Sequence, residues 1–386
     1  MGVIYNRTQL SSDIATMVST ADYSTNIQVV ANNAVRQVLS DVDLRSTKRR
    51  TALTPSLFEN IYDYAAPASL KGNKIIDIEP QIDRTQFDDW QLTSGEEFDR
   101  RKQTGTDGLI AVVDYDMTKR IRVSLPIDEE SITVDEINAV DSWLLFGDGT
   151  NLTTDTSNFV NGSASINWDI SSAGGTTAGI YNASLDTFDI SDYLTTGSAF
   201  VWVYISSTTN LTNFILRIGS DSSNYYYITI TTGNEGLAFV AGWNLLRFDF
   251  ANKATTGTPD DDACDYVALY MTKAGAKISE TDYRFNNLMI GNGEHYNVIY
   301  YSRYLWQSSA GVYLENSTAT GDYLNCEADE YQLFLYKTAS LTELDAHNFE
   351  RANALELEYQ RKLGQYKQQY PSEAIGMSSS TWNKTY

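Results

Sequence analysis

The ten residues AGWNLLRFDF (241–250) carry the pattern that decides the fold of the middle of this chain. Leu246, Phe248 and Phe250 alternate with charged residues. Because successive side chains of a β-strand point to opposite faces, this order places the three apolar side chains on one face. The segment is therefore predicted to be a strand with one face against a core.

Strand-length runs of this kind recur from Trp143 to about residue 290. Turn-rich segments such as SSAGGTTAG (171–179) and ATTGTPDDD (254–262) separate them. Short strands at this spacing, with many glycines and few prolines, favour an antiparallel β-sandwich. The other runs are FVWVYI (200–205), NFILRIG (213–219), NYYYITI (224–230), DYVALYM (265–271) and RFNNLMI (284–290).

The N-terminal part of the chain has helical periodicity instead. Apolar residues at spacings of three and four follow Ser24, so we expect an amphipathic helix over 24–40 that Ser24 caps. Thr54-Pro55 is predicted to open a second helix. The apolar face of that helix would consist of Leu57, Phe58, Ile61 and Tyr62. Short β-rich runs at 74–81, 108–116 and 119–127 follow, with Ser94 and Glu97 as a capping box for one short helix.

The C-terminal part is expected to contain strands and then a long helix. The runs NVIYYSRYLW (297–306), GVYL (311–314) and EYQLFLYK (330–337) are interpreted as strands. Ser340 and Glu343 are interpreted as a capping box that opens a helix over 341–370, which ends before Pro371. Its apolar face would consist of Leu344, Phe349, Ala352, Leu355, Tyr359, Leu363, Tyr366 and Tyr370.

The helices of the two chain ends determine the expected domain organisation. Each has an apolar stripe that needs a partner, and the simplest solution packs them against each other. The expected fold class is α+β: a discontinuous body of helices and a small β-sheet, residues 1–139 and 294–386, with an antiparallel β-sandwich inserted at 140–293.

The composition argues against several classes of partner. The formal charge is −22, from 50 acidic and 28 basic residues, which disfavours nucleic-acid binding. No segment resembles a signal peptide or a membrane span, so we expect a soluble product made in a cytoplasm, without a membrane partner. The 26 tyrosines and 7 tryptophans indicate large packed surfaces or interfaces.

Residues for catalysis are scarce. His295 and His347 are the only histidines, and the sequence contains no Gly-x-Ser-x-Gly motif and no nucleotide-binding glycine loop. We therefore expect no enzymatic activity, no catalytic residues and no cofactor. The acidic turns at 147–155 and 258–265 could supply oxygen ligands to a structural calcium ion. Cys264 and Cys326 are expected to be free, buried thiols.

Three consecutive tyrosines are candidate glycan contacts. Because neighbouring side chains alternate between the faces of a strand, Tyr225, Tyr226 and Tyr227 cannot all face a core. A ring that points outward could stack on a sugar. The alternative is that both faces are covered, in the sandwich or in an oligomer.

One dense basic cluster, Arg45, Lys48, Arg49 and Arg50, stands out in this acidic chain. Two explanations remain open. The cluster could contact DNA, or it could pair with acidic residues across a subunit interface, which is the simpler explanation.

The segment 141–293 resembles the jelly-roll domains of carbohydrate-binding modules. The matching stretches are Trp143, NFVNGSASINWDI (158–170), FDISDY (188–193), FVWVYI, AGWNLLRFDF and YRFNNLMIG (283–291). In such modules a structural calcium ion often lies near the first and last strands, where a carboxylate of the last strand helps to hold it. Here that strand has Asn286 and Asn287 instead. The resemblance implies a jelly-roll fold without defining a ligand.

The flanking segments resemble virion proteins of tailed bacteriophages, of the kind found at the neck between portal and tail. The matching stretches are AVRQVLSDVDLRSTKRRTALTPSLFENIYDYAAPASLKGNKIIDI (34–78), VIYYSRYLW (298–306) and ANALELEYQRKLGQYKQQYPSEAIG (352–376). This resemblance implies a structural component of a phage particle, most simply a head-to-tail connector that forms a homo-oligomeric ring and contacts portal or tail components. The sandwich would project outward and could bind host-surface glycans.

The ring interface implied by this resemblance would come from the two long helices and the basic cluster. Its residues would be Val35, Leu39, Arg45, Lys48, Arg49, Arg50, Leu344, Phe349, Leu355, Tyr359, Leu363 and Tyr366. One alternative is a glycan-binding adhesin, such as a tail fibre or receptor-binding module, in which the sandwich is the working part. The other is a capsid decoration or minor head protein.

Overall fold

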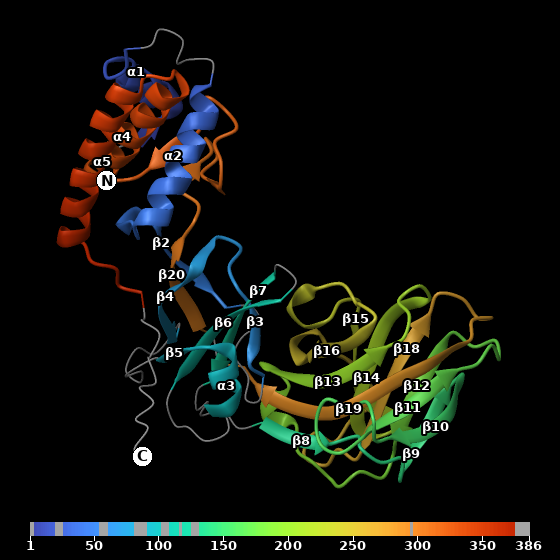
Figure 1. The fold of residues 1–386 in the computed structure, drawn as a ribbon. Helices are drawn as coiled ribbons and strands as arrows, with labels where there is room; N and C mark the ends of the chain where they lie inside the picture. Colours follow the sequence, from blue (N-terminus) through green and yellow to red (C-terminus); the bar gives the residue numbers. More distant parts are fainter. Residues whose placement is uncertain are drawn as a thin grey trace, which may run out of the picture. The chain divides into compact units, whose positions relative to one another are not determined.

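The computed structural model describes residues 4–19, 26–53, 61–80, 91–101, 108–115, 118–124, 131–293 and 296–374. The chain separates into two compact units. The first unit comprises Met1–Leu53, Ala65–Ser124 and Tyr296–Tyr386, and the second unit comprises Thr54–Tyr64 and Leu125–His295. In Figure 1 the second unit is mostly green and yellow, whereas the blue and red segments of the two chain ends share the first. Among the described residues, no helix is both long and apolar enough to cross a membrane.

The second unit is a β-sandwich of two six-stranded sheets, in which every described strand pair is antiparallel. The β19 sheet has the order β10-β11-β19-β13-β16, and β8 also pairs with β19. Its strands are β8 (Ser131–Asp135), β10 (Gly149–Asp155), β11 (Ser165–Ile170), β13 (Gly197–Ile205), β16 (Gly242–Asp249) and β19 (Glu280–Asn292).

The second sheet of the sandwich, called the β14 sheet below, has the order β17-β15-β14-β18-β12-β9. Its strands are β9 (Trp143–Gly147), β12 (Thr177–Asn182), β14 (Leu211–Asp221), β15 (Asn224–Ile230), β17 (Ala254–Thr256) and β18 (Tyr266–Lys273). The six strands predicted between residues 200 and 290 are therefore confirmed as β13, β14, β15, β16, β18 and β19.

One hydrophobic core lies between the two sheets. Leu246, Phe248 and Phe250 are fully buried in it, as the alternation in AGWNLLRFDF predicts. The expected start of the sandwich at residue 140 is too late, because β8 (Ser131–Asp135) pairs with β19. The pattern change near Trp143 corresponds to the start of β9, the second strand of the sandwich, and not to the start of the sandwich.

The helices of the first unit come from both ends of the chain. They are α1 (Arg7–Ala15), α2 (Ile27–Asp41), α4 (Ala328–Asp345) and α5 (Phe349–Gln369). Residues of all four share one hydrophobic cluster with Trp306 and Leu324, and Figure 1 shows α2, α4 and α5 side by side. The expected packing of the terminal helices against each other is confirmed. The sequence did not predict α1, and Ser24, the expected cap of α2, lies outside the described residues.

The predicted strand EYQLFLYK (330–337) is wrong, because these residues lie in α4. The helix begins after Glu327, whose backbone N–H donates to Glu330 Oε2 at 3.0 Å. The predicted capping pair lies inside the same helix: Ser340 Oγ donates to the Ala352 carbonyl of α5 at 3.1 Å, and buried Glu343 accepts from the Ser19 backbone N–H. The predicted helix 341–370 is therefore two helices, and α5 ends at Gln369, just before Pro371.

The expected second helix after Thr54-Pro55 falls mainly on residues 54–60, outside the described residues. Ile61 and Tyr62 are described and are not helical. The end of the predicted helix is therefore contradicted, whereas its start is not tested. Lys48–Ala52, which precedes it, forms a strand, β2. β2 pairs along its full length with β20 (Tyr296–Ser302).

Small sheets complete the first unit. One has the order β2-β20-β4, with β4 at Leu70–Pro80, and another has the order β1-β23-β21-β22. A third has the order β3-β7-β6-β5, and the division between the units falls within β3. The predicted capping of α3 (Gly95–Arg101) is confirmed by the Glu97 N–H, which donates to Ser94 Oγ at 3.2 Å. The remaining bounds are β1 (Ile4–Asn6), β3 (Asp63–Ala65), β5 (Gln91–Thr93), β6 (Leu109–Tyr115), β7 (Thr118–Ser124), β21 (Trp306–Gln307), β22 (Tyr313–Leu314) and β23 (Tyr323–Asn325).

Candidate functional site

The face of the β14 sheet that points away from the core is rich in aromatic residues. In β14, Phe214, Leu216 and Ile218 are buried in the core of the sandwich, so Ile215 and Arg217 point to the opposite side. The same alternation in the neighbouring strands brings six rings to this side, which we call the aromatic face. They are Phe146, Tyr181, Tyr225, Tyr227, Tyr266 and Tyr270.

The strand register places these rings around β14. Tyr227 and Ala268 flank Arg217 across the sheet. Tyr225 and Tyr266 both pair with Gly219. A Cβ at Gly219 would collide with the backbone of Tyr225, so glycine keeps the strands and the two flanking tyrosines in register.

The six rings form a continuous series of contacts. Tyr227 lies 6.2 Å from Tyr225 between ring centroids, Tyr225 lies 6.3 Å from Tyr266, and Tyr266 lies 6.4 Å from Tyr181. Phe146 continues the series at 6.4 Å from Tyr181, and it stacks on Tyr270 at 4.3 Å. These separations are typical of favourable aromatic pairs. The series therefore forms one ordered platform, in which Tyr266 and Tyr270 are buried and the other four rings are half-buried or exposed.

Arg217 lies inside this series of rings. Its guanidinium carbon is 4.6 Å from the Tyr225 centroid, 5.0 Å from Tyr270 and 5.3 Å from Phe146. Burial raises the pKa of the Tyr266 and Tyr270 hydroxyls, and Arg217, which interacts with both, partly offsets that rise. The rings and the phenol oxygens thus hold the guanidinium in place.

The three predicted tyrosines divide between the two sides of β15. Tyr225 and Tyr227 belong to the aromatic face, and Tyr227 is 37% exposed. Tyr226 packs against the core instead, and its hydroxyl donates to Asp261 Oδ1 at 2.7 Å. Burial, followed by this carboxylate, raises the pKa of Tyr226 to about 12.

Four members of the aromatic face were not singled out from the sequence: Phe146, Tyr181, Tyr266 and Tyr270. In DYVALYM (265–271) the only available signal was the two tyrosines four residues apart, which must lie on the same side of a strand. That signal does not say which side faces the core. Phe146 and Tyr181 come from strands distant in the sequence, so only the pairing of strands brings them here.

Most of the predicted ring-interface residues lie inside the helical part. Val35, Leu39, Leu355, Tyr359, Leu363 and Tyr366 are buried, so they hold the chain together and do not form a surface for another subunit. Leu344 and Phe349 are 46% and 60% exposed. Val29 of α2 and Leu357 of α5 are exposed as well. Val29 and Leu344 line a groove of about 490 Å³ between α2 and α4.

The basic cluster pairs with acids of its own chain. Lys48 Nζ lies 2.7 Å from Glu373, Arg50 Nε lies 2.7 Å from Glu79, and Arg45 Nη1 lies 3.8 Å from Glu327. Arg49 stacks over Tyr313 at 3.8 Å from the ring centroid. Pairing with acidic neighbours was expected across a subunit interface, but the structure places these partners within the first unit.

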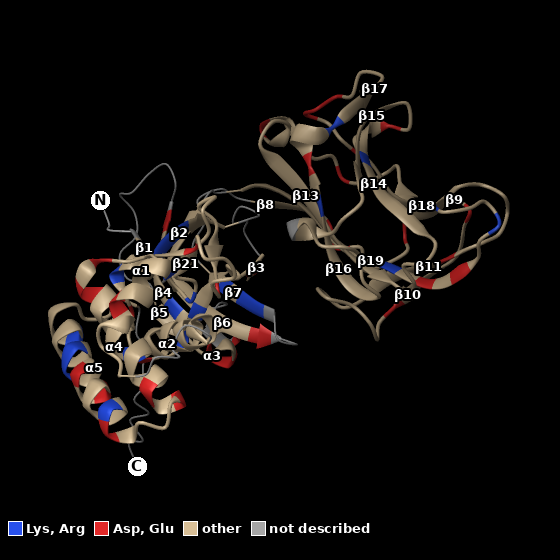
Figure 2. Ribbon diagram, turned by 90° about the horizontal axis from the view of Figure 1, so that it is seen from above, with Lys and Arg blue, Asp and Glu red and all other residues tan. Residues whose placement is uncertain are grey.

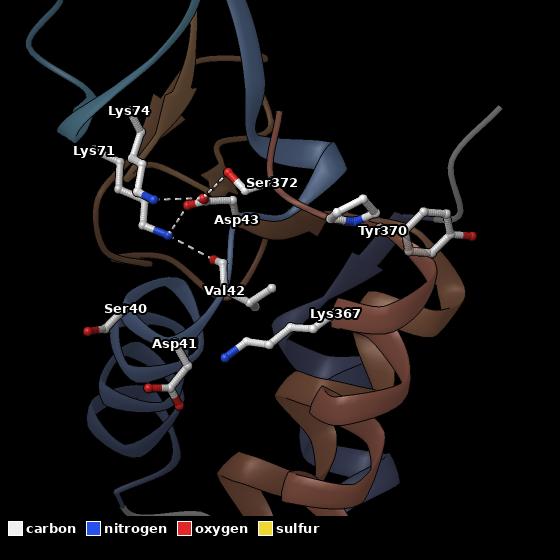
Figure 3. A pocket seen from close by; sticks show the side chains of 10 residues that line it. Ser40, Asp41, Val42, Asp43, Lys71, Lys74, Lys367, Tyr370 and Ser372 are labelled. Carbon is white, nitrogen blue, oxygen red and sulfur yellow. Dashed lines mark hydrogen bonds and ion pairs between the residues drawn. The ribbon is translucent and has the colours of Figure 1, made fainter. Parts of the chain in front are cut away.

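A polar cavity of about 340 Å³ lies where α2, β4 and the end of α5 meet, and Figure 3 shows its lining. Asp43 is its centre: the carboxylate accepts from Lys71 at 2.6 Å and from Ser372 Oγ at 2.6 Å, and Lys74 Nζ lies 3.2 Å away. Burial raises the pKa of Asp43, but these partners outweigh it and the pKa is lowered. The lysines are thus engaged internally, which leaves the aromatic face as the stronger candidate site.

The acidic turns considered for calcium have partners within the sandwich. Asp148 lies 2.5 Å from Lys273 Nζ, Asp155 lies 2.8 Å from Arg284 Nε, and Asp261 accepts from Tyr226. The described residues contain no group of three or more His, Cys, Asp or Glu side chains arranged to hold a metal ion. Calcium binding stays a prediction. Cys264 and Cys326 are free and buried, as expected.

The comparison with solved structures finds carbohydrate-binding modules. The family 11 module from Clostridium thermocellum, in complex with a β-1,3-1,4-mixed-linked tetrasaccharide, is 16% identical over 42% of this chain and 94% of that chain, with a TM-score of 0.30. A family 30 module is 10% identical over 43% and 98%, also with a TM-score of 0.30. The CBM22-1–GH10 modules of a Clostridium thermocellum xylanase, complexed with xylohexaose, are 16% identical over 43% of this chain, with a TM-score of 0.28.

This chain spans 29% of the length of that xylanase structure. At these identities and TM-scores, the likeness establishes no ligand for the sandwich. No protein-family model matches the sequence, and no curated protein matches it. The similar structures are of the kind that the sequence resemblance of 141–293 led us to expect, and nothing in these comparisons points to a phage virion protein.

Proposed function

We propose that the protein binds a polysaccharide through the aromatic face of its sandwich, without acting on it chemically. The observation that carries this proposal is the series of six rings on the side of the β14 sheet that faces away from the core. Rings packed against one another keep their orientation, so little conformational entropy is lost when a ligand stacks on them. The apolar faces of sugar rings fit such a platform, while tyrosine hydroxyls and Arg217 can reach the sugar hydroxyls.

The test is binding of the full chain to a panel of neutral and acidic polysaccharides, measured by affinity electrophoresis and by calorimetry with oligosaccharides. The double variant Tyr225→Ala/Tyr227→Ala removes the more exposed end of the platform and should weaken binding by about tenfold or more. The matched control is Tyr204→Ala on the β19 sheet, where Tyr204 packs against Trp243. Equal effects of the two variants would contradict the proposal.

We further propose that the first unit attaches the protein to a tailed-phage particle, as a neck ring or another structural component of the virion made in the host cytoplasm. The resemblance of the flanking segments supports this, as do the exposed apolar side chains of Val29, Leu344 and Phe349. Apolar residues in this arrangement are common where a surface meets a partner. The sandwich would then provide glycan binding on the particle.

Assembly is tested by deleting residues 131–293 and by the variant Leu344→Glu/Phe349→Glu, each introduced into the phage. We expect the deletion to leave incorporation into particles intact and the charged variant to abolish it. Copy number in purified particles separates the alternatives: a ring-like multiple indicates a connector, a few copies indicate a fibre or adhesin, and hundreds indicate a capsid decoration protein. Loss of assembly in the deletion variant, with the first unit still folded, would overturn the connector role.

A further inference from the structure

Some basic side chains of the sandwich form ion pairs with carboxylates, and others do not. Lys273 pairs with Asp148 at 2.5 Å, Arg284 pairs with Asp155 at 2.8 Å and with Asp282 at 2.6 Å, and Arg247 lies 3.6 Å from Asp249. Within the described part of the chain, no carboxylate forms an ion pair with Arg217. Figure 2 shows how few basic residues the sandwich contains, in a chain with a formal charge of −22. Among the described residues, Lys253 and Lys277 also form no ion pair, but Lys253 donates to the Leu194 carbonyl at 2.7 Å and Lys277 is exposed to solvent. Arg217 differs from both because it lies among the rings of the aromatic face.

The surroundings of Arg217 make the missing counter-charge significant. Three ring centroids lie within 5.3 Å of its guanidinium carbon, and its cross-strand neighbour Ala268 is fully buried. Rings and phenol oxygens stabilise a cation without neutralising it. A guanidinium has five N–H donors in a planar fork, and that fork matches a carboxylate in two parallel hydrogen bonds.

We propose that the aromatic face selects polysaccharides that carry carboxylates, the uronic-acid class, and that Arg217 is the residue that recognises the carboxylate. This inference rests on the proposed glycan binding and narrows it to one class of ligand. The more exposed rings, Tyr225 and Tyr227, stack on the sugar units, and the carboxylate of a uronate supplies a counter-charge that no described residue supplies to Arg217. Arg217 is half-buried, and the lower local dielectric among the rings strengthens charge-assisted hydrogen bonds.

A purely structural role for Arg217 is the competing explanation. In that role the guanidinium would only hold Phe146, Tyr225 and Tyr270 together. Its removal would then loosen the platform and weaken every ligand to the same extent. Discrimination between a charged ligand and its neutral counterpart therefore separates the two explanations, whereas loss of binding alone does not.

The experiment uses the full chain with oligogalacturonates and with the same oligomers as methyl esters, which differ only in charge. We expect the wild-type chain to bind the acidic oligomers about tenfold to a hundredfold more tightly than the esters, and this preference to shrink as salt is added. Arg217→Met should abolish the preference while the esters still bind. Arg217→Lys, which keeps the charge but not the fork, should retain part of it.

Lys277→Met is the control, because it removes one charge from an exposed position of the same unit and should leave the preference unchanged. If Arg217→Met does not fold, the preference of the wild-type chain and its partial retention in Arg217→Lys still decide the question. Equal binding of acid and ester by the wild-type chain, or a preference that persists in Arg217→Met, would overturn this inference and leave glycan binding standing. Absence of binding to every oligosaccharide of the panel would refute the proposed function itself.

Discussion

The helical part and the sandwich both contain groups of tyrosines, but the hydroxyl groups of the two sets have different partners. In the helices, Tyr359 donates to Asp41, Tyr366 to Glu330 and Tyr331 to Asp13, each at 2.7 Å. Burial and these carboxylates raise the pKa of all three. On the aromatic face the central charged group is Arg217.

The comparison shows how a structural tyrosine differs from one available to a ligand. A hydroxyl that donates to a carboxylate of another helix joins two elements of the chain and is already engaged by that carboxylate. The rings of the aromatic face are arranged around a positive charge that has no counter-ion among the described residues. Their spacing in the sequence does not reveal this difference, which depends on the partners that the fold provides.

The largest expected effect is on stability, and it tests the tyrosines that join the helices. Tyr359→Ala should lower the free energy of unfolding of the first unit by about 3–5 kcal/mol, because the ring is fully buried and the hydroxyl holds Asp41. Tyr227→Ala, at a 37% exposed position, should cost the sandwich under about 1 kcal/mol. Urea unfolding followed by fluorescence measures both free energies. Similar losses at the two positions would contradict the distinction between structural tyrosines and tyrosines available to a ligand.

A smaller effect isolates the hydroxyl group. The Tyr366 hydroxyl donates to buried Glu330 and accepts from the Arg45 backbone N–H at 3.0 Å. Tyr366→Phe leaves both groups without this partner and should lower the free energy of unfolding by about 1–3 kcal/mol. Tyr227→Phe should change it by no more than about 0.5 kcal/mol, measured by the same unfolding curves. An unchanged stability of Tyr366→Phe would show that the ring alone matters.

The smallest effect concerns Tyr226, the one tyrosine of the 225–227 triplet that bonds a carboxylate. Its pKa is about 12 in the folded sandwich and 10.0 as an unperturbed tyrosine. The unfolded chain therefore releases this proton first, so the contribution of Tyr226 is fully present below pH 10 and is lost between pH 10 and about 12. Unfolding curves at pH 9 and pH 11 should show a smaller decline in Tyr226→Phe than in the wild-type chain. An identical decline in both would exclude Tyr226 as its source.

Several elements could be predicted from the sequence for clear physical reasons. In AGWNLLRFDF the apolar and charged side chains of residues 246–250 alternate, and this order indicates a half-buried strand. In EYQLFLYK (330–337) apolar and polar side chains follow no clear period over eight residues, and periodicity cannot separate a short buried helix from a strand. The sequence analysis did not predict that α4 begins after Glu327, because its capping box has a glutamate at the N-cap in place of the usual Ser or Thr.

The candidate site was predictable only in part. Alternation within β15 was enough to separate Tyr225 and Tyr227 from Tyr226. Tyr181, Tyr266 and Phe146 join them because strands far apart in the chain pair in one register, and local patterns carry no information on that register. The burial of Tyr359 and Tyr366 could not be predicted from the sequence either, because an apolar stripe on a helix can face a core or a second subunit.

By itself, the sequence determined that the middle of this chain forms strands with one apolar face, because the side chains of a strand alternate whatever surrounds it. It also determined that the terminal helices need apolar partners. The tertiary structure alone decided which partners they have and which face of the β14 sheet stays outside the core. It also placed Arg217 against the rings of Phe146, Tyr225 and Tyr270, with no ion pair to a carboxylate among the described residues. These outcomes depend on how distant segments pair in space.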